Sequence, residues 1–165
     1  MNRFTDAGRR AIEDKNDYAA LSLALMIPDI CGSLEDPGPG KSRERYERWF
    51  KQWAELKFGS NLSAAECYQL RCSMIHSGSA EIQRGILDRF VFLDHTGTLH
   101  MVRFQSNLSD GVPVPNALVL LVSKFSETIY QAADEWDTSM KNNAAVQAEK
   151  AKLLVIHSGV KRIGF

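Results

Sequence analysis

The sequence has no net charge, because 20 lysine and arginine residues balance 20 aspartate and glutamate residues. This balance excludes a bulk basic surface that coats nucleic acid, since such binding needs many phosphate neutralisations. A local site for one or two phosphates remains compatible with it. The proportions of hydrophobic residues (44%) and charged residues (24%) are those of an ordinary globular protein. We therefore expect one domain, residues 1–165, with a sizeable core.

Cysteines are few, and a long apolar run is missing. Cys31, Cys67 and Cys72 are an odd number of cysteines, and no secretory leader pattern precedes them, so we expect reduced thiols in a cytoplasmic protein. The longest apolar run, around residues 19–28, is too short to span a bilayer. No membrane partner is therefore expected. No glycine-rich dinucleotide turn follows a predicted strand, so no cofactor is expected either.

The first half of the chain is predicted to be helical. Residues 5–34 contain helix formers throughout, and residues 18–27 are apolar nearly all round, which is typical of a central helix. Pro28 lacks an amide proton, so it predicts an end or a kink near Ile27. A second helix over residues 42–58 presents one broad aromatic face, with Ser42 as its predicted N-cap.

A third helix is predicted over residues 63–77. Ser63 and Glu66 form a capping box in the stretch SAAE, and Gly78 is expected to adopt the left-handed conformation after the last turn. Arg71 therefore lies in the middle of this helix, and His76 lies in its last turn.

The second half of the chain adds a predicted sheet and a further helix. Residues 88–105 are typical of a β-hairpin with its turn near residues 95–98, and residues 116–140 predict a long helix. The β-prone segment 152–160 is expected to add a third strand to the hairpin. The predicted fold is mainly α, a bundle of four to five helices with a small antiparallel β-hairpin or sheet.

Two familiar patterns are set aside. Residues 38–42, GPGKS, end like a phosphate-binding loop, but the required preceding glycine is Glu35 and the required preceding strand is a helix. Cys72 and His76 have the i, i+4 spacing of two metal ligands, yet no second Cys/His pair accompanies them. No metal is therefore expected.

Arg71 and His76 are the candidate catalytic residues. At about 100° per residue, five residues turn a helix by about 500°, so the two side chains point about 140° apart. One chain therefore gives a poor two-residue site, whereas two copies of the helix related by a two-fold axis could form one shared cleft. A histidine that moves protons beside an arginine that holds a phosphate is the minimum equipment for cleaving RNA without metal.

The stretch YQLRCSMIHSGS, with MIPDICGSLE and RYERWF upstream, resembles the HEPN superfamily (higher eukaryotes and prokaryotes nucleotide-binding domains). The resemblance implies a HEPN-like bundle of four to five helices, a homodimer across the motif helix and metal-independent endoribonuclease activity. It implies Arg71 and His76 as the motif residues and RNA as the substrate. Members serve as toxins, phage-defence effectors or RNA-processing enzymes, so an antitoxin or regulatory protein is an expected partner class.

Several alternatives stay open. Active members commonly carry a polar residue after the arginine, and here it is Cys72, so a catalytically inactive module that binds a nucleotide or protein is the second hypothesis. A third is a purely structural dimer. Three further polar residues could support the site: Asp29, Arg45 and Tyr46. Asp29 could pair with Arg71 or Arg45, or orient His76. It could instead cap a helix end or form an ordinary ion pair.

Overall fold

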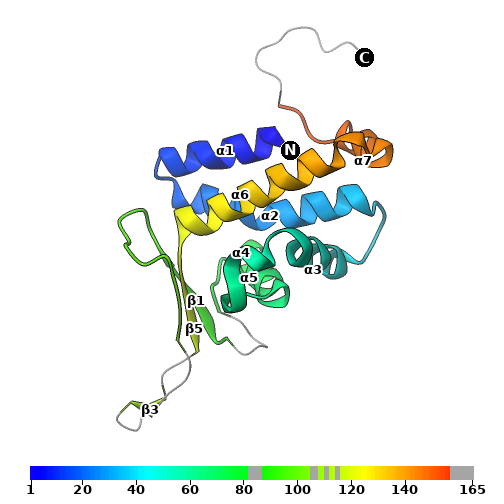
Figure 1. The fold of residues 1–165 in the computed structure, drawn as a ribbon. Coiled ribbons are helices and arrows are strands. Elements are labelled where there is room, and N and C mark those ends of the chain that lie inside the picture. The colour runs from blue at the N-terminus through cyan, green and yellow to red at the C-terminus, as the bar shows by residue number, and fades with distance from the viewer. Residues whose placement is uncertain (82–86, 105–107, 110–111, 114–115, 157–165) are drawn as a thin grey trace.

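The computed structural model describes residues 1–81, 87–104, 108–109, 112–113 and 116–156. The protein is mainly helical, with a small sheet against one end of the helical body (Figure 1). The α-helices of the described residues are α1 (Asn2–Glu13), α2 (Asp17–Glu35), α3 (Ser42–Trp53), α4 (Glu55–Phe58), α5 (Ala64–Ser77), α6 (Val122–Ser139) and α7 (Ala144–Lys150). Short 3₁₀ turns, Gly59–Asn61 and Met140–Asn142, follow α4 and α6.

Helix α2 is the central element of the fold. It packs against α1, α3, α5, α6 and α7, and its Ala20, Ala24, Leu25 and Ile27 side chains are fully buried. The prediction of a central helix over this segment is therefore confirmed. The single helical segment over residues 5–34 is divided, because Lys15 adopts a left-handed conformation (φ 58°) between α1 and α2.

The helix does not end near Ile27, one of the two outcomes expected from Pro28, because α2 continues through Pro28 to Glu35. Proline removes one backbone hydrogen bond. The turn that follows it buries Cys31 and Leu34 in the core, at 0% and 6% exposure, and this burial favours continuing the helix.

By length and composition, α2 is apolar enough to cross a membrane, although half of its most apolar window is buried inside the protein. In Figure 1, α1 lies on one side of α2 and α3 and α5 lie on the other, and α6 and α7 also contact it. Its apolar character is accounted for by this central position, which is the property that the sequence pattern predicts for a core helix.

The sheet is mixed, and the predicted hairpin is wrong. Strands β1 (Arg89–Leu93) and β2 (Met101–Phe104) do not pair with each other, because β5 (Ala117–Leu121) lies between them. β5 pairs with β1 in parallel and with β2 antiparallel. Two short strands, β3 (Leu108–Ser109) and β4 (Val112–Pro113), pair separately.

Strand β5 also corrects two neighbouring predictions. Its sequence ALVLL is a continuous apolar run, which periodicity alone cannot distinguish from buried helix, so the helix expected from residue 116 begins at Val122 instead. The third strand of the sheet is β5 and not the segment 152–160. Residues 152–156 form no strand, and residues 157–160 lie outside the described residues.

The start of α5 is as predicted. The Ser63 amide donates to Glu66 Oε2 at 3.0 Å, and the Glu66 amide donates to Ser63 Oγ at 3.3 Å, so both halves of the capping box are present. Gly78 follows the helix with φ 62°, the predicted left-handed cap. Arg103 of β2 donates to Glu66 Oε1 at 2.8 Å, which ties the sheet to this helix start.

The start of α3 differs from the prediction. Lys41, with φ 59°, occupies the N-cap position, but its side chain makes no capping hydrogen bond. Ser42 is the first helical residue. The Ser42 hydroxyl donates instead to Asp29 Oδ1 on α2, at 3.1 Å. The predicted helix over residues 42–58 is also interrupted at Ala54, which separates α3 from α4.

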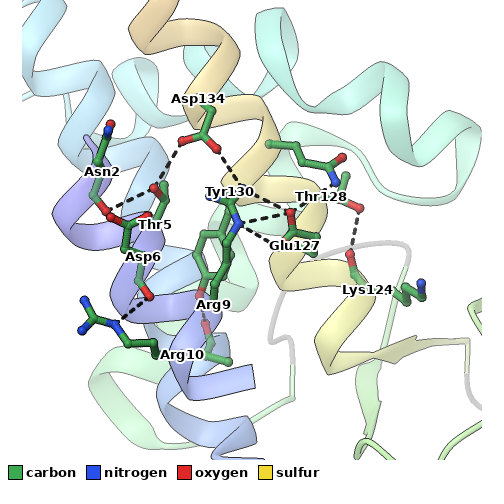
Figure 2. A network of polar contacts seen from close by, with 12 residues as sticks. Asn2, Thr5, Asp6, Arg9, Arg10, Lys124, Glu127, Thr128, Tyr130 and Asp134 are labelled. Carbon is green, nitrogen blue, oxygen red and sulfur yellow. Dashed lines mark hydrogen bonds and ion pairs between the residues drawn. The ribbon is translucent and has the colours of Figure 1, made fainter. Parts of the chain in front are cut away.

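A polar network joins α1 to α6 (Figure 2). Arg9 forms ion pairs with Glu127 at 3.1 Å and Asp134 at 2.8 Å, and the fully buried Thr5 hydroxyl donates to the other Asp134 oxygen at 3.2 Å. Beneath it, the buried Tyr130 hydroxyl donates to the Ala20 carbonyl of α2 at 2.6 Å. The network therefore fixes α1 and α6 relative to the central helix.

The close approach of α1 to α6 depends on a glycine. An added Cβ at Gly8 would lie 2.2 Å from the Cζ atom and the hydroxyl oxygen of Tyr130. We expect Gly8→Ala to lower the free energy of unfolding by about 2 kcal/mol, because the fixed tyrosine ring cannot make room. Chemical denaturation measures the change. The exposed Asp6→Ala variant on the same helix is the control, and equal stability of both variants would contradict the packing described.

Candidate functional site: the α5 face and Arg71

Helix α5 has a buried face and an uncovered face. Its Ala64, Cys67 and Leu70 side chains are buried where the helix packs against α2 and α3. The side chains on the other face recur at spacings of three and four residues and are only partly buried or exposed: Tyr68, Cys72, Ile75 and His76. Ile75 is 43% exposed although it is apolar. We call these four residues the α5 stripe.

Arg71 lies at the border between the two faces and is held by α2. Its Nε atom lies 2.5 Å from Asp29 Oδ2, and the two side chains are only 20% and 19% exposed. Burial lowers the pKa of Arg71, but the attraction of the Asp29 carboxylate and the neighbouring Cys72 outweighs burial and raises it overall. Asp29 also accepts the Ser42 hydroxyl, so one carboxylate joins α2, α3 and α5.

Within the described residues, the Nη atoms of the Arg71 guanidinium make one weak contact. Its Nη1 atom lies 3.9 Å from Cys72 Sγ, a weak contact, and the described residues show no hydrogen bond from either Nη atom to an oxygen. Tyr68, one turn earlier, lies under the Arg43 guanidinium at 6.0 Å. Burial raises the pKa of Tyr68, and the neighbouring Cys72 raises it further.

His76 is placed apart from Arg71. It lies in the last turn of α5 and is exposed, and it makes no hydrogen bond or ion pair with the described part of the chain. The helical geometry keeps the two side chains about 140° apart around the axis. Within the described residues, the single chain therefore brings Arg71, Asp29 and Ser42 together and gives His76 no side-chain partner.

Arg45 and Tyr46 have structural contacts. Arg45 Nη1 donates to the carbonyls of Asp36 at 2.9 Å and Gly38 at 2.8 Å, which fastens the loop between α2 and α3. Tyr46 is fully buried with its hydroxyl 3.3 Å from Cys67 Sγ, and this burial raises its pKa well above the usual range. The structure thus places Asp29 against Arg71, whereas the contacts of Arg45 and Tyr46 are with the α2–α3 loop and with Cys67.

The arrangement can bind an anion more readily than a metal. Within the described residues, no group of three His, Cys, Asp or Glu side chains could hold a metal ion. The Nη atoms of Arg71 can instead donate two hydrogen bonds to a phosphate group. The sequence did not predict Ser42 as a site residue. A serine at the start of a helix is typical of an N-cap, and that was the role predicted for it.

Comparisons of the chain with protein-family models, with curated proteins and with solved structures find no match.

The Asp29–Arg71 pair is testable by a double-mutant cycle with Asp29→Asn and Arg71→Met. We expect a coupling free energy of about 2 kcal/mol, because the removal of either partner leaves the other half-buried and unpaired. Urea unfolding of the four proteins measures it. The Arg43–Glu47 pair on the surface of α3, at 2.6 Å, is the matched control and should couple much more weakly because water screens it. Coupling no larger than in that control would contradict the ion pair.

Proposed function

We propose that the protein is a HEPN-like homodimer that cleaves RNA without a metal ion, using Arg71 and His76 from both subunits. The observation that supports the proposal is the difference between the contacts of the Nε atom and those of the Nη atoms of Arg71. Arg71 forms an ion pair with Asp29 through its Nε atom, and within the described residues neither Nη atom bonds an oxygen, so the Nη atoms are available for a phosphate. The mainly helical architecture, with the motif on an uncovered helix face, is compatible with a HEPN-like bundle.

The proposed chemistry is transfer of the phosphate to the neighbouring 2′-oxygen. A neutral histidine takes the 2′-hydroxyl proton as the 2′-oxygen attacks phosphorus, and a protonated histidine gives a proton to the departing 5′-oxygen. Imidazole suits both steps because it gains and loses a proton near neutral pH. Arg71 offsets the negative charge that builds up on the phosphorane. The products are a 2′,3′-cyclic phosphate and a 5′-hydroxyl.

The second subunit is needed for geometric reasons. Two α5 stripes that pack about a two-fold axis would bury both Ile75 side chains and place two Arg71 and two His76 side chains around one cleft. The two histidines could then divide the roles of base and acid. The partly apolar stripe suits such an interface, because its centre would exclude water while the arginines remain at its edge.

The activity is tested on single-stranded RNA of mixed sequence in excess EDTA. We expect cleavage with 2′,3′-cyclic phosphate ends, and a loss of at least about a hundredfold in rate for His76→Ala and for Arg71→Ala, since each removes one catalytic contribution. His100→Ala removes another exposed histidine, outside α5, and should leave the rate unchanged. No cleavage by the unaltered protein, or equal cleavage by the unaltered protein and all three variants, would contradict the ribonuclease proposal.

The dimer is tested separately with Ile75→Asp. A carboxylate buried in the α5 interface would be costly, so we expect the dimer dissociation constant to rise at least about tenfold, as measured by analytical ultracentrifugation. Leu56→Asp on α4, where the side chain is 91% exposed, is the matched control and should keep the dimer. If both variants dimerise like the unaltered protein, the interface does not lie on the α5 stripe.

A second candidate function is a catalytically inactive module that binds a nucleotide at Arg71. It is favoured by the pairing of Arg71 with Asp29, which cancels much of the positive charge that a reacting phosphate needs, and by Cys72, a weak hydrogen-bonding residue, beside that arginine. Retention of RNA binding with no cleavage, together with loss of binding in Arg71→Ala, would support this function over the first.

A further inference from the structure

A concave site lies beside the C-terminal half of α5 and is lined by its Leu70 and Met74. It has a volume of about 820 Å³, within the usual range for a small-molecule pocket. The turn between α1 and α2, the end of α5 and strand β1 enclose it. Its floor is apolar and formed by residues of α2, α5, β1 and α6: Leu21, Leu70, Met74, Phe92 and Val122. We call it the α2–β1 groove.

The rim of the α2–β1 groove is mostly acidic. Asp14, Asp17 and Asp94 contribute three carboxylates, against the single ammonium of Lys15. Asp17 also faces the imidazole of His95, at 3.4 Å. The rim therefore attracts cations and repels phosphates and carboxylates, in contrast to the site at Arg71.

Two rim features add to this preference. The Thr96 hydroxyl and amide both bond one oxygen of Asp94 and lower the pKa of that carboxyl, which keeps it ionised at neutral pH. Tyr18 is 84% exposed although it is a large aromatic residue, so the face of its ring is open to a ligand. An aromatic face attracts an organic cation electrostatically.

We propose that the α2–β1 groove binds a small organic cation, with its apolar body on the Leu70, Met74 and Phe92 floor and its ammonium group at the acidic rim. The argument is charge complementarity together with size, since the groove accommodates an aromatic or branched aliphatic amine. The site is distinct from the Arg71 site and does not depend on ribonuclease activity. Leu70 and Met74 belong to α5, so the ligand would contact the helix that also carries Arg71 and His76.

Three probes of nearly equal shape test the proposal on the full chain: 3-phenylpropylammonium, 3-phenylpropan-1-ol and 3-phenylpropanoate. Binding is followed by amide shifts in two-dimensional NMR. We expect the ammonium probe to move the signals of groove residues such as Gly78, Ser79 and Ala80, with a dissociation constant at least about tenfold below that of the carboxylate probe. The neutral alcohol should lie between the two.

The matched variants change the rim without changing the floor. Asp14→Asn combined with Asp94→Asn should abolish the preference for the ammonium probe, whereas Glu13→Gln, an exposed carboxylate next to the groove but outside its lining, should preserve it. Equal affinities for the three probes, tightest binding of the carboxylate, or no shifts in groove residues at any soluble concentration would each overturn the proposal. Tightest binding of the carboxylate would assign the groove to anionic compounds instead.

Discussion

The enclosure of α2 is the constraint on which the rest of the structure depends. A helix that is apolar around most of its circumference cannot be left on a surface, because each exposed side chain forfeits the free energy of its burial. Five helices therefore contact it, and the large buried rings of Trp49, Trp136 and Tyr130 fill the spaces around them. The polar groups of the core are positioned by this packing, as in the bond from Tyr130 to the Ala20 carbonyl.

The candidate site follows from the same constraint. Asp29 lies on a part of α2 that turns away from the deepest core, and it is reached from two covering helices, by Ser42 of α3 and by Arg71 of α5. A carboxylate in this position orients the arginine and also stabilises the junction of the three helices. Structural and functional roles are therefore combined in one side chain, and any change at Asp29 affects both.

Much of the helical part could be predicted from the sequence, because its signals are local. The Ser63–Glu66 capping box and the Gly78 cap depend on neighbours within a few residues, and both are present in the structure. The pairing of β1 with β5 joins residues nearly thirty positions apart, and an apolar run such as ALVLL carries no period that distinguishes strand from helix. The contact of Asp29 with Arg71 was one of several predicted alternatives, and only the packing of α2 against α5 selects it.

The junction between β5 and α6 has a consequence for how this chain can tolerate change. Leu121 is both the last residue of the central strand and the residue directly before α6, so no loop separates the sheet from the helix. An insertion there would shift the register of β5 against both neighbouring strands or rotate the buried face of α6. The exposed turn around residues 95–100 joins strands that are not neighbours, and it is tied to the rest of the fold by single contacts, from the Leu121 amide to the His100 carbonyl at 3.3 Å and from His95 to Asp17 at 3.4 Å. Length variation among descendants of this sequence should therefore accumulate in that turn and be absent from the strand–helix junction.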